Sequence, residues 1–323
     1  MRRRTLIGGA AALPVAFTPT WALAQAFPSK PVRIVVPFGP GGIADLVARA
    51  IAQKLGEQLR QSVVVENKPG AGGVVAGDMV AKAEPDGHTL LLMSNGTAVS
   101  ATLFQSLPFN AQKDFAPVAT LGVFDIAVLT AADSRFKSMK ELLAYARANP
   151  GKLNMATINV GSSQHLSAEL LKTSAGVDFQ VVPFNGSPAV LTALRGGQVD
   201  AAVEILGPML PQIAAKAVQP LAVMGARRAA SLPDVPTMVE SGVAGFDVAS
   251  WNALAAPART PPAVVAQLNR EVNKVLADPG VRKQLADLNV TPRGGTPEQL
   301  GELLASETRR WADVIIRAKV PRQ

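Results

Sequence analysis

The chain has 323 residues, of which 48% are apolar and 17% are charged. This composition excludes a disordered or fibrous protein, and the length predicts one large domain or two lobes of roughly 100 to 150 residues. The sequence has no cysteine, a net charge of +8 that is scattered rather than clustered, and only 5% aromatic residues, which excludes disulfides and thiolate metal sites and argues against a nucleic-acid partner.

The first 26 residues have the pattern of a signal peptide that is removed on export. Arg2 to Arg4 form a basic start, Leu6 to Phe17 form an apolar stretch, and Ala22-Leu23-Ala24 or Ala24-Gln25-Ala26 provides a small-x-small cleavage site. The basic start fits the Sec route and also the twin-arginine route. We therefore expect a mature protein that is free in the periplasm.

After this segment, short β-branched runs alternate with helical patterns, which is typical of an α/β protein with mostly parallel sheets wrapped by helices. The apolar spacing in the first part of the chain predicts strands and helices in alternation. Their expected order is a strand over 32–37, a helix over 46–59, a strand over 62–66, a helix that ends near Ala83, and a strand over 89–94.

The middle of the chain repeats this alternation of strands and helices. A helix is expected to start at Ser138, with Glu141 at the capping-box spacing. Another helix is expected to have Ser187 as its N-cap, Pro188 as its first residue, and its end at Gly196-Gly197. The expected strands of this region cover 153–158, 180–184, 199–205 and 220–224, and an apolar stripe that includes Leu166, Leu170 and Leu171 predicts a helix after the first of them.

The C-terminal part changes character, because helices are expected over 262–277, 279–288 and 296–318 with little strand between them. Thr296 and Gln299 again have the capping-box spacing. We expect two lobes between which the chain crosses twice. The first lobe is expected to comprise residues 27–124 and 224–323, and the second residues 125–223.

Three of the expected strands are followed by a loop rich in glycine or serine that leads into a helix, after Val36, Ile158 and Phe184. The free N–H groups and the positive dipole end of a helix N-terminus favour an anion, and ligands of open α/β sheets bind at the carboxyl ends of the strands. A single loop of this kind is explained by a tight turn and a helix cap. Three such loops, distributed over both lobes, predict a cleft that holds a small anion.

Several alternatives arise from individual residues. Ser162, Ser163 and His165 lie close together, which raises the hypothesis of a periplasmic serine hydrolase, but they do not form the G-x-S-x-G pattern and helix capping explains the serines. A scaffold without a small ligand is a third hypothesis.

Asp45 in the first turn of a helix and Glu204 at the end of a strand are expected either to contact the ligand or to organise the loops. With two histidines in the whole chain, we expect no metal site and no cofactor.

Several segments, spread over nearly the whole chain, together form a sequence pattern that is specific to one family. The segments are 28–38 followed by Gly41-Gly42 and Asp45, then 65–73, 85–87, 114–118, 161–166, 196–200 and 232–237. Taken together, this set resembles the Bug-type receptors, which are the substrate-binding proteins of tripartite tricarboxylate transporters.

The resemblance implies a two-lobed periplasmic-binding-protein fold of type II that closes by a hinge over a small carboxylate ligand. It implies that the loops over 37–45 and 159–163 clamp one ligand carboxylate, and that the partners are membrane transporter subunits or a sensor domain. The sequence departs from the family's usual residues at Thr97, at Val203-Glu204-Ile205 and at Trp251-Asn252-Ala253. These positions are expected near the far end of the pocket, which the resemblance therefore does not define.

We thus predict a monomeric carboxylate receptor without catalytic residues. The residues expected to contact the ligand are Phe38, Gly39, Gly41, Gly42, Asp45, Asn95, Thr97, Asn159, Ser162, Ser163, His165, Asn185, Gly186, Ser187 and Glu204.

Overall fold

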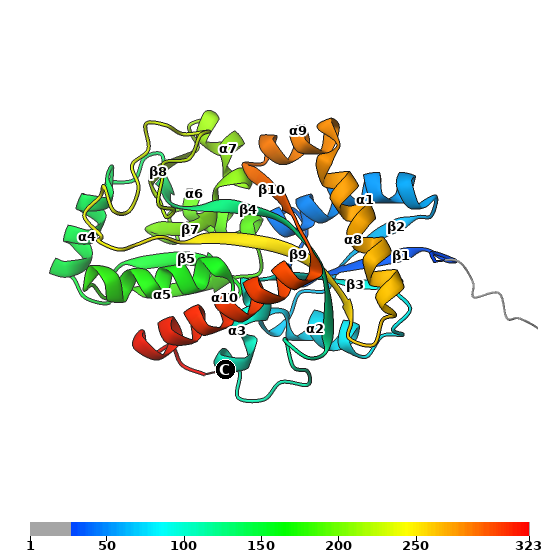
Figure 1. The fold of residues 1–323 in the computed structure, drawn as a ribbon. Coiled ribbons are helices and arrows are strands. Elements are labelled where there is room, and N and C mark those ends of the chain that lie inside the picture. Colours follow the sequence, from blue (N-terminus) through cyan, green and yellow to red (C-terminus); the bar gives the residue numbers. More distant parts are fainter. Residues whose placement is uncertain (1–26, 323) are drawn as a thin grey trace, which may run out of the picture.

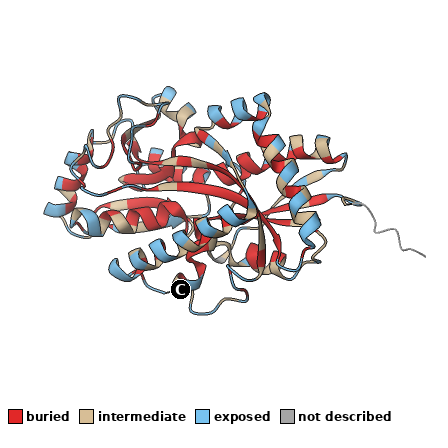
Figure 2. Cartoon of the chain, in the orientation of Figure 1, coloured by how far each residue is buried: buried red, intermediate tan, exposed pale blue. Residues whose placement is uncertain are grey.

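The computed structural model describes residues 27–322, so the expected signal peptide lies outside the described residues. The chain forms two α/β lobes that lie side by side (Figure 1). The buried residues follow the strands and the helix faces that pack against them (Figure 2). None of the helices within this range is both long and apolar enough to cross a membrane.

The first lobe is built on β1 (Val32–Val36), which pairs in parallel with β2 (Val63–Asn67) and β3 (Thr89–Ser94). The sheet continues with antiparallel strands, because β3 pairs with β9 (Ala249–Pro257) and β9 pairs with the first part of β4 (Phe115–Ala131). β10 (Val290–Gly294) adds another antiparallel edge to β4. The helical segments of this lobe are α1 (Ile43–Leu59), η1 (Ala71–Gly73), α2 (Val74–Ala81), α3 (Asn95–Leu103), α8 (Pro262–Ala277), α9 (Pro279–Asp287) and α10 (Pro297–Arg317).

The second lobe has the same central arrangement. β5 (Asn154–Ile158) pairs in parallel with β6 (Gln180–Phe184) and β7 (Ala201–Ile205). The second part of β4 pairs antiparallel with β7 and with β8 (Val218–Val223). The helices of this lobe are α4 (Met139–Ala148), α5 (Ser163–Ala175), α6 (Ser187–Arg195) and α7 (Leu206–Ala214).

β4 is shared by both sheets. Its 17 residues pair with β9 as far as Asp125, and with β7 from Ile126 onward. Figure 1 shows β4 and β9 running together from one lobe to the other. The long strand was not predicted from the sequence, because its apolar run has no alternation and contains Pro117 and Gly122.

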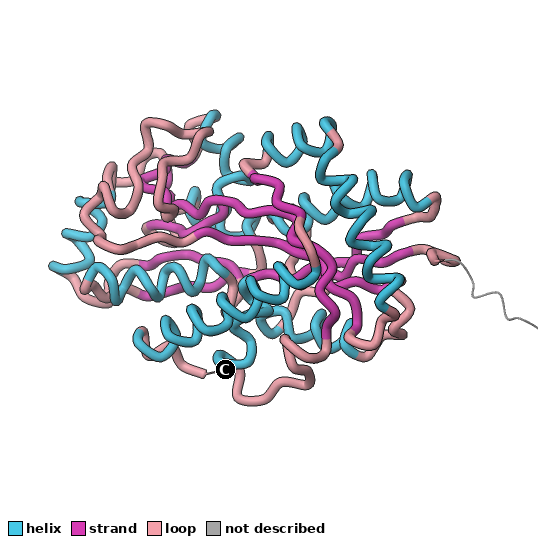
Figure 3. Tube along the Cα trace, in the orientation of Figure 1, coloured by secondary structure: helices cyan, strands magenta, loops and turns pink. Residues whose placement is uncertain are grey.

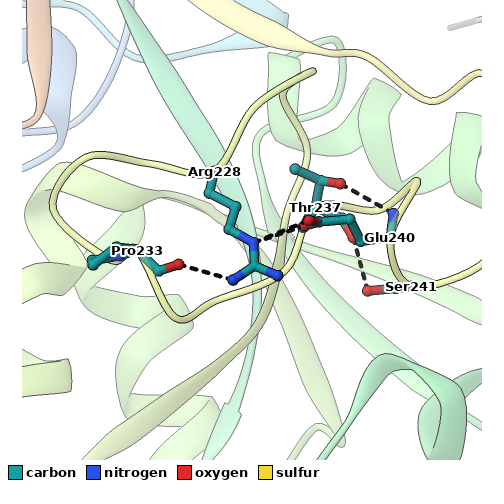
Figure 4. Close-up of polar contacts among 5 residues, drawn as sticks. All are labelled: Arg228, Pro233, Thr237, Glu240 and Ser241. Carbon is teal, nitrogen blue, oxygen red and sulfur yellow. Dashed lines mark hydrogen bonds and ion pairs between the residues drawn. The ribbon is translucent and has the colours of Figure 1, made fainter.

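The chain returns to the first lobe through residues 224–248, which are drawn mostly as loop in Figure 3. Polar contacts inside this segment hold its shape (Figure 4). Arg228 Nε donates to both carboxylate oxygens of Glu240 at 3.1 and 2.9 Å, and its Nη1 donates to the Pro233 carbonyl at 3.0 Å. Thr237 N donates to the Glu240 carboxylate at 2.7 Å, and Ser241 Oγ donates to the Thr237 carbonyl at 2.8 Å. The segment is therefore an ordered connection and not a loose linker.

The predicted strands and helices of the parallel units are confirmed to within a few residues. The three predicted C-terminal helices are confirmed, and the five-residue β10 is the strand between α9 and α10. β9, which precedes these helices and pairs with β3 and β4, was missed. α3 and α7 were also missed. α7 contains Pro211, which a sequence pattern reads as a helix breaker.

The helix caps are partly as predicted. Thr296 and Gln299 form the expected reciprocal capping box. At α4, Ser138 Oγ accepts from Glu141 N as expected, but the Glu141 carboxylate accepts from Lys137 N. Ser187 as an N-cap was wrong: Gly186 is the N-cap of α6, and Ser187 is its first residue.

Replacing Thr296 by alanine should destabilise the protein by about 1 kcal/mol, because the α10 N-terminus would lose its side-chain acceptor. The free energy of unfolding from urea denaturation measures this change. Ser306→Ala is the control on the same helix, because the Ser306 hydroxyl bonds only the Leu303 carbonyl and such a substitution shifts stability by about 0.5 kcal/mol or less. An equal effect of the two substitutions would contradict the role of the cap.

Candidate functional site

A cavity lies between the two lobes, where the space between protein atoms, including the part open to solvent, is about 430 Å³. Its wall combines apolar side chains with hydroxyl and amide groups, and none of the described lining residues carries a basic side chain. The lining residues are Phe38, Gly39, Gly42, Ile43, Ala44, Ser94, Phe124, Ile158, Ser163, Gln164, Gly186, Ser187, Ile205, Ser250 and Asn252.

Within residues 27–322, five helices begin at this cavity. A residue of the N-terminal cap or first turn of α1, α3, α5, α6 and α7 lies in the wall. The first N–H groups of a helix have no partner inside the helix, and the helix dipole places positive potential there. The cavity is therefore suited to a negatively charged group although no cationic side chain lines it.

Asp45 holds the loop between β1 and α1 in place from the side away from the cavity. Its carboxylate accepts from Gly41 N at 3.0 Å and pairs with Arg49 at 2.8 Å. Asn67 Nδ2 donates to the Phe38 carbonyl at 3.0 Å and secures the other end of the loop. Burial alone would raise the pKa of Asp45, but the hydrogen bonds from Arg49, Gly41 and Asn67 outweigh it and lower the pKa. Asp45 is thus a charged group beneath the loop and not part of the cavity wall.

The serines at the start of α5 have separate tasks. Ser162 is the N-cap; its Oγ accepts from His165 N at 3.1 Å and donates to the Ile158 carbonyl at 3.1 Å. Ser163 faces the cavity, where its Oγ lies 2.6 Å from the Oγ of Ser250 on β9. This hydrogen bond joins the helix of the second lobe to a strand of the first lobe's sheet.

His165 is buried beside these serines. Burial and the charge of Lys172 lower its pKa to about 4, so the ring is neutral at neutral pH. The hydrogen bond of the Ser163 hydroxyl is made with Ser250. This geometry does not assemble the serine–histidine pair that a hydrolase needs.

Glu204 lies fully buried directly behind the cavity wall. Its Oε2 accepts hydrogen bonds from three groups of wall residues: Gln164 Nε2, Ser187 Oγ and Ile205 N, at 3.2, 3.0 and 3.1 Å. Burial raises the pKa of Glu204 to about 7, although these three hydrogen bonds oppose the change. The bond to Glu204 also explains why the Ser187 hydroxyl does not cap its own helix.

The remaining predicted contacts lie around the cavity. Asn95 is buried at the start of α3, where its Nδ2 donates to the Ala249 carbonyl at 3.5 Å. Thr97 faces a neighbouring cavity of about 280 Å³, which shares Ser94 with the first. Asn159 closes the turn before α5, because its carbonyl accepts from Ser162 N.

Glycines allow the two lobes to approach closely at the cavity rim. A Cβ added to Gly39 would lie 3.0 Å from the carbonyl oxygen of Asn185, and one added to Gly72 would lie 2.7 Å from that of Val160. Of the predicted contacts, Gly41 and Asn185 lie at this rim and do not line the cavity; a Cβ added to Gly41 would lie 3.6 Å from Pro188 Cγ. Gly39 and Gly42 are part of the cavity wall.

Sequence reasoning missed several wall residues. Phe124 and Ser250 come from β4 and β9, the strands that were not predicted, whereas Asn252, also on β9, lies in the wall at a position that was expected near the pocket. Ser94 caps α3 through a reciprocal capping box with Thr97, and the serine–threonine spacing at 94 and 97 was the available signal. Gln164, which lies between Ser163 and His165, was not among the predicted contacts.

Comparisons with known proteins agree with this architecture. Residues 47–320 match the tripartite tricarboxylate transporter family receptor. The chain is 41% identical, over 99% of its length and 95% of the relative, to the protein of the tcbD-tcbE intergenic region of Pseudomonas sp. (strain P51).

Solved structures share the whole fold. Rpa4515 of R. palustris, solved with adipate, is 33% identical with a TM-score of 0.87, over 91% of this chain and 98% of that one. The periplasmic binding protein BugD is 33% identical with a TM-score of 0.87, over 92% and 100%. MatC of Rhodopseudomonas palustris, with bound malate, is 37% identical with a TM-score of 0.85, over 90% and 100%. Together with the family match, these likenesses show that the chain belongs to the tripartite tricarboxylate transporter family receptors.

Proposed function

We propose that this protein is a periplasmic receptor that closes its two lobes over a small carboxylate ligand and does not alter it chemically. The observation that carries this function is the convergence of five helix N-termini, from both lobes, on one cavity. A carboxylate accepts hydrogen bonds from backbone N–H groups and is stabilised by the helix dipoles.

The other wall residues define the rest of the ligand. Phe38, Ile43, Phe124, Ile158 and Ile205 supply apolar surface, which suits a carbon chain or ring attached to the carboxylate. The structural neighbours solved with adipate and with malate support this ligand class. The Ser163, Ser187 and Ser250 hydroxyls and the Asn252 amide provide polar contacts for orientation.

Binding and closure are coupled through the two lobes, which we assign to residues 27–124 with 224–323 and to residues 125–223. A ligand that touches helix ends of both lobes stabilises the closed arrangement over the open one, which shifts the population toward closure. The ligand-bound form is then recognised by membrane transporter subunits or by a sensor domain. The receptor acts as a monomer, because each chain contains both halves of the site.

Small carboxylates should raise the melting temperature of the purified protein, because they bind the folded form only. At one hundred times the dissociation constant, the stabilisation is about 2.7 kcal/mol. Thermal unfolding with a panel of adipate, malate, citrate and benzoate checks this expectation, and the matching alcohols are the uncharged controls. Failure of every acid in the panel to shift the melting temperature would contradict the proposed function.

Replacing Gly39 by valine should weaken carboxylate binding at least tenfold, or about 1.4 kcal/mol, because the new side chain would meet the Asn185 carbonyl across the cleft. The melting temperature without ligand should change little, since the open arrangement leaves room for the side chain. Titration calorimetry with the tightest acid of the panel measures the effect. Gly301→Val is the control, because a Cβ there lies 4.0 Å from its nearest neighbour, Pro117 Cγ. Equal affinity of the Gly39 variant and the wild type would argue against closure at this rim.

Replacing Ser163 by alanine distinguishes a receptor from a hydrolase. The substitution removes the hydroxyl that joins α5 to Ser250, so we expect the affinity to fall about fivefold, as for the loss of one hydrogen bond of about 1 kcal/mol. The wild type should not hydrolyse p-nitrophenyl acetate above the buffer rate. Esterase activity that is present in the wild type and abolished by Ser163→Ala would instead support an enzyme.

A further inference from the structure

The Glu204 carboxyl group is separated from the cavity only by the residues that it holds. Gln164, Ser187 and Ile205 all line the cavity and all donate to Oε2. Oε1 is buried and has no hydrogen-bond partner among the described residues. Because Oε2 already accepts three hydrogen bonds, Oε1 is the oxygen that takes a proton when the group is neutral.

No charged side chain among the described residues compensates Glu204. The elements that pack against β7 are β4, β5, α5, α6 and α7, and their titratable groups have other surroundings. Asp125 accepts from Asn289, Lys172 pairs with Glu169, and Arg195 is exposed. His165 is neutral near pH 7, because burial and Lys172 lower its pKa to about 4. The charge of Glu204 is therefore balanced only by helix N-termini and neutral donors.

The same helix N-termini would also stabilise a ligand carboxylate. α5, α6 and α7 each contribute a group that donates to Glu204 and a residue of the cavity wall. Two negative charges would then share one positively polarised region of low dielectric constant. Like charges in such a site raise the proton affinity of the group that titrates more easily. Burial already raises the pKa of Glu204 to about 7, whereas simple carboxylic acids titrate near pH 4.

We propose that Glu204 couples carboxylate capture to the uptake of one proton, which it takes at Oε1 as the ligand enters. This coupling rests on the proposed function and assigns to Glu204 a positioning role: the ligand does not need to touch it. Linkage is reciprocal, so the ligand raises the proton affinity of Glu204 and the proton raises the affinity for the ligand. Through this buried acid, the affinity of the receptor for its ligand would depend on the pH of its compartment.

Titration calorimetry with adipate and malate from pH 6.5 to 8.5 tests the coupling, because both acids are almost fully ionised over this range. For the wild type, the dissociation constant should rise with pH above about 7, by at most tenfold per pH unit, as expected for one linked proton. Measurements in two buffers of different ionisation enthalpy should show net proton uptake on binding. For Glu204→Gln, the dissociation constant should not vary with pH and proton uptake should vanish.

Glu169→Gln is the matched control. Burial also raises the pKa of Glu169, and it lies on α5, but it pairs with Lys172 and is not part of the cavity wall. This variant should keep the pH dependence of the wild type. A pH dependence that is lost equally in Glu169→Gln, or retained in Glu204→Gln, would overturn the assignment to Glu204.

Gln164→Met provides a second test if Glu204→Gln does not fold. Gln164→Met preserves the length of the side chain but removes one donor to Oε2, so the pKa of Glu204 should rise and the weakening of affinity should begin at a higher pH. An unchanged onset would overturn the proposal.

The pH dependence of stability without ligand distinguishes a failure of the coupling from a failure of the proposed function. Because the pKa of Glu204 is higher in the folded than in the unfolded state, its contribution to stability is full below about pH 4.5 and is lost as the pH rises through about 7. The stability of the wild type should therefore fall relative to Glu204→Gln over that range. If this difference is found but no acid of the panel binds at any pH, the proposed function fails and the coupling fails with it. If both acids bind with no pH dependence, only the coupling is wrong.

Discussion

The site depends on helix N-termini, whose first N–H groups have no partner inside the helix. In a parallel βαβ unit each strand leads directly into a helix, so the helix starts gather at the carboxyl edge of the sheet. Two such sheets lie side by side here and share β4, and α1, α3, α5, α6 and α7 all begin at the cavity between the lobes. A cationic side chain would bring its own charge and flexibility, whereas these backbone groups are held rigidly by the fold. The family's carboxylate chemistry follows from this arrangement of ordinary secondary structure.

Two buried carboxyl groups show how different hydrogen-bond partners shift the pKa in opposite directions. Asp45 lies beneath the first loop with Arg49 as a partner, and its hydrogen bonds lower its pKa. Glu204 lies beneath the opposite wall with neutral donors only, and burial raises its pKa to about 7. Both side chains organise residues that face the cavity. The first remains a constant anion, while the second is poised to change its charge.

Much of the fold could be predicted because the parallel units are encoded locally, by β-branched runs, glycine-rich loops and amphipathic helices. The wall residues Gly39, Gly42, Ser163 and Ser187 were found in this way. What could not be predicted depends on contacts between distant segments. β4 and β9 are apolar along most of their length, and their antiparallel pairing brings together at the site Phe124 and Ser250, which are more than one hundred positions apart in the sequence.

The shared strand β4 limits how the lobes can move. Hydrogen-bond ladders fix its residues to β9 as far as Asp125 and to β7 from Ile126, so sliding along the strand would break ladders on both sides. A twist about the few backbone bonds between the two ladders leaves them intact. In the proposed closure, the backbone at Asp125 and Ile126 is therefore the part of β4 about which the lobes would turn. Phe124 lies next to this point and in the cavity wall, so it would stay in place as a fixed apolar surface while the walls of the two lobes approach or separate.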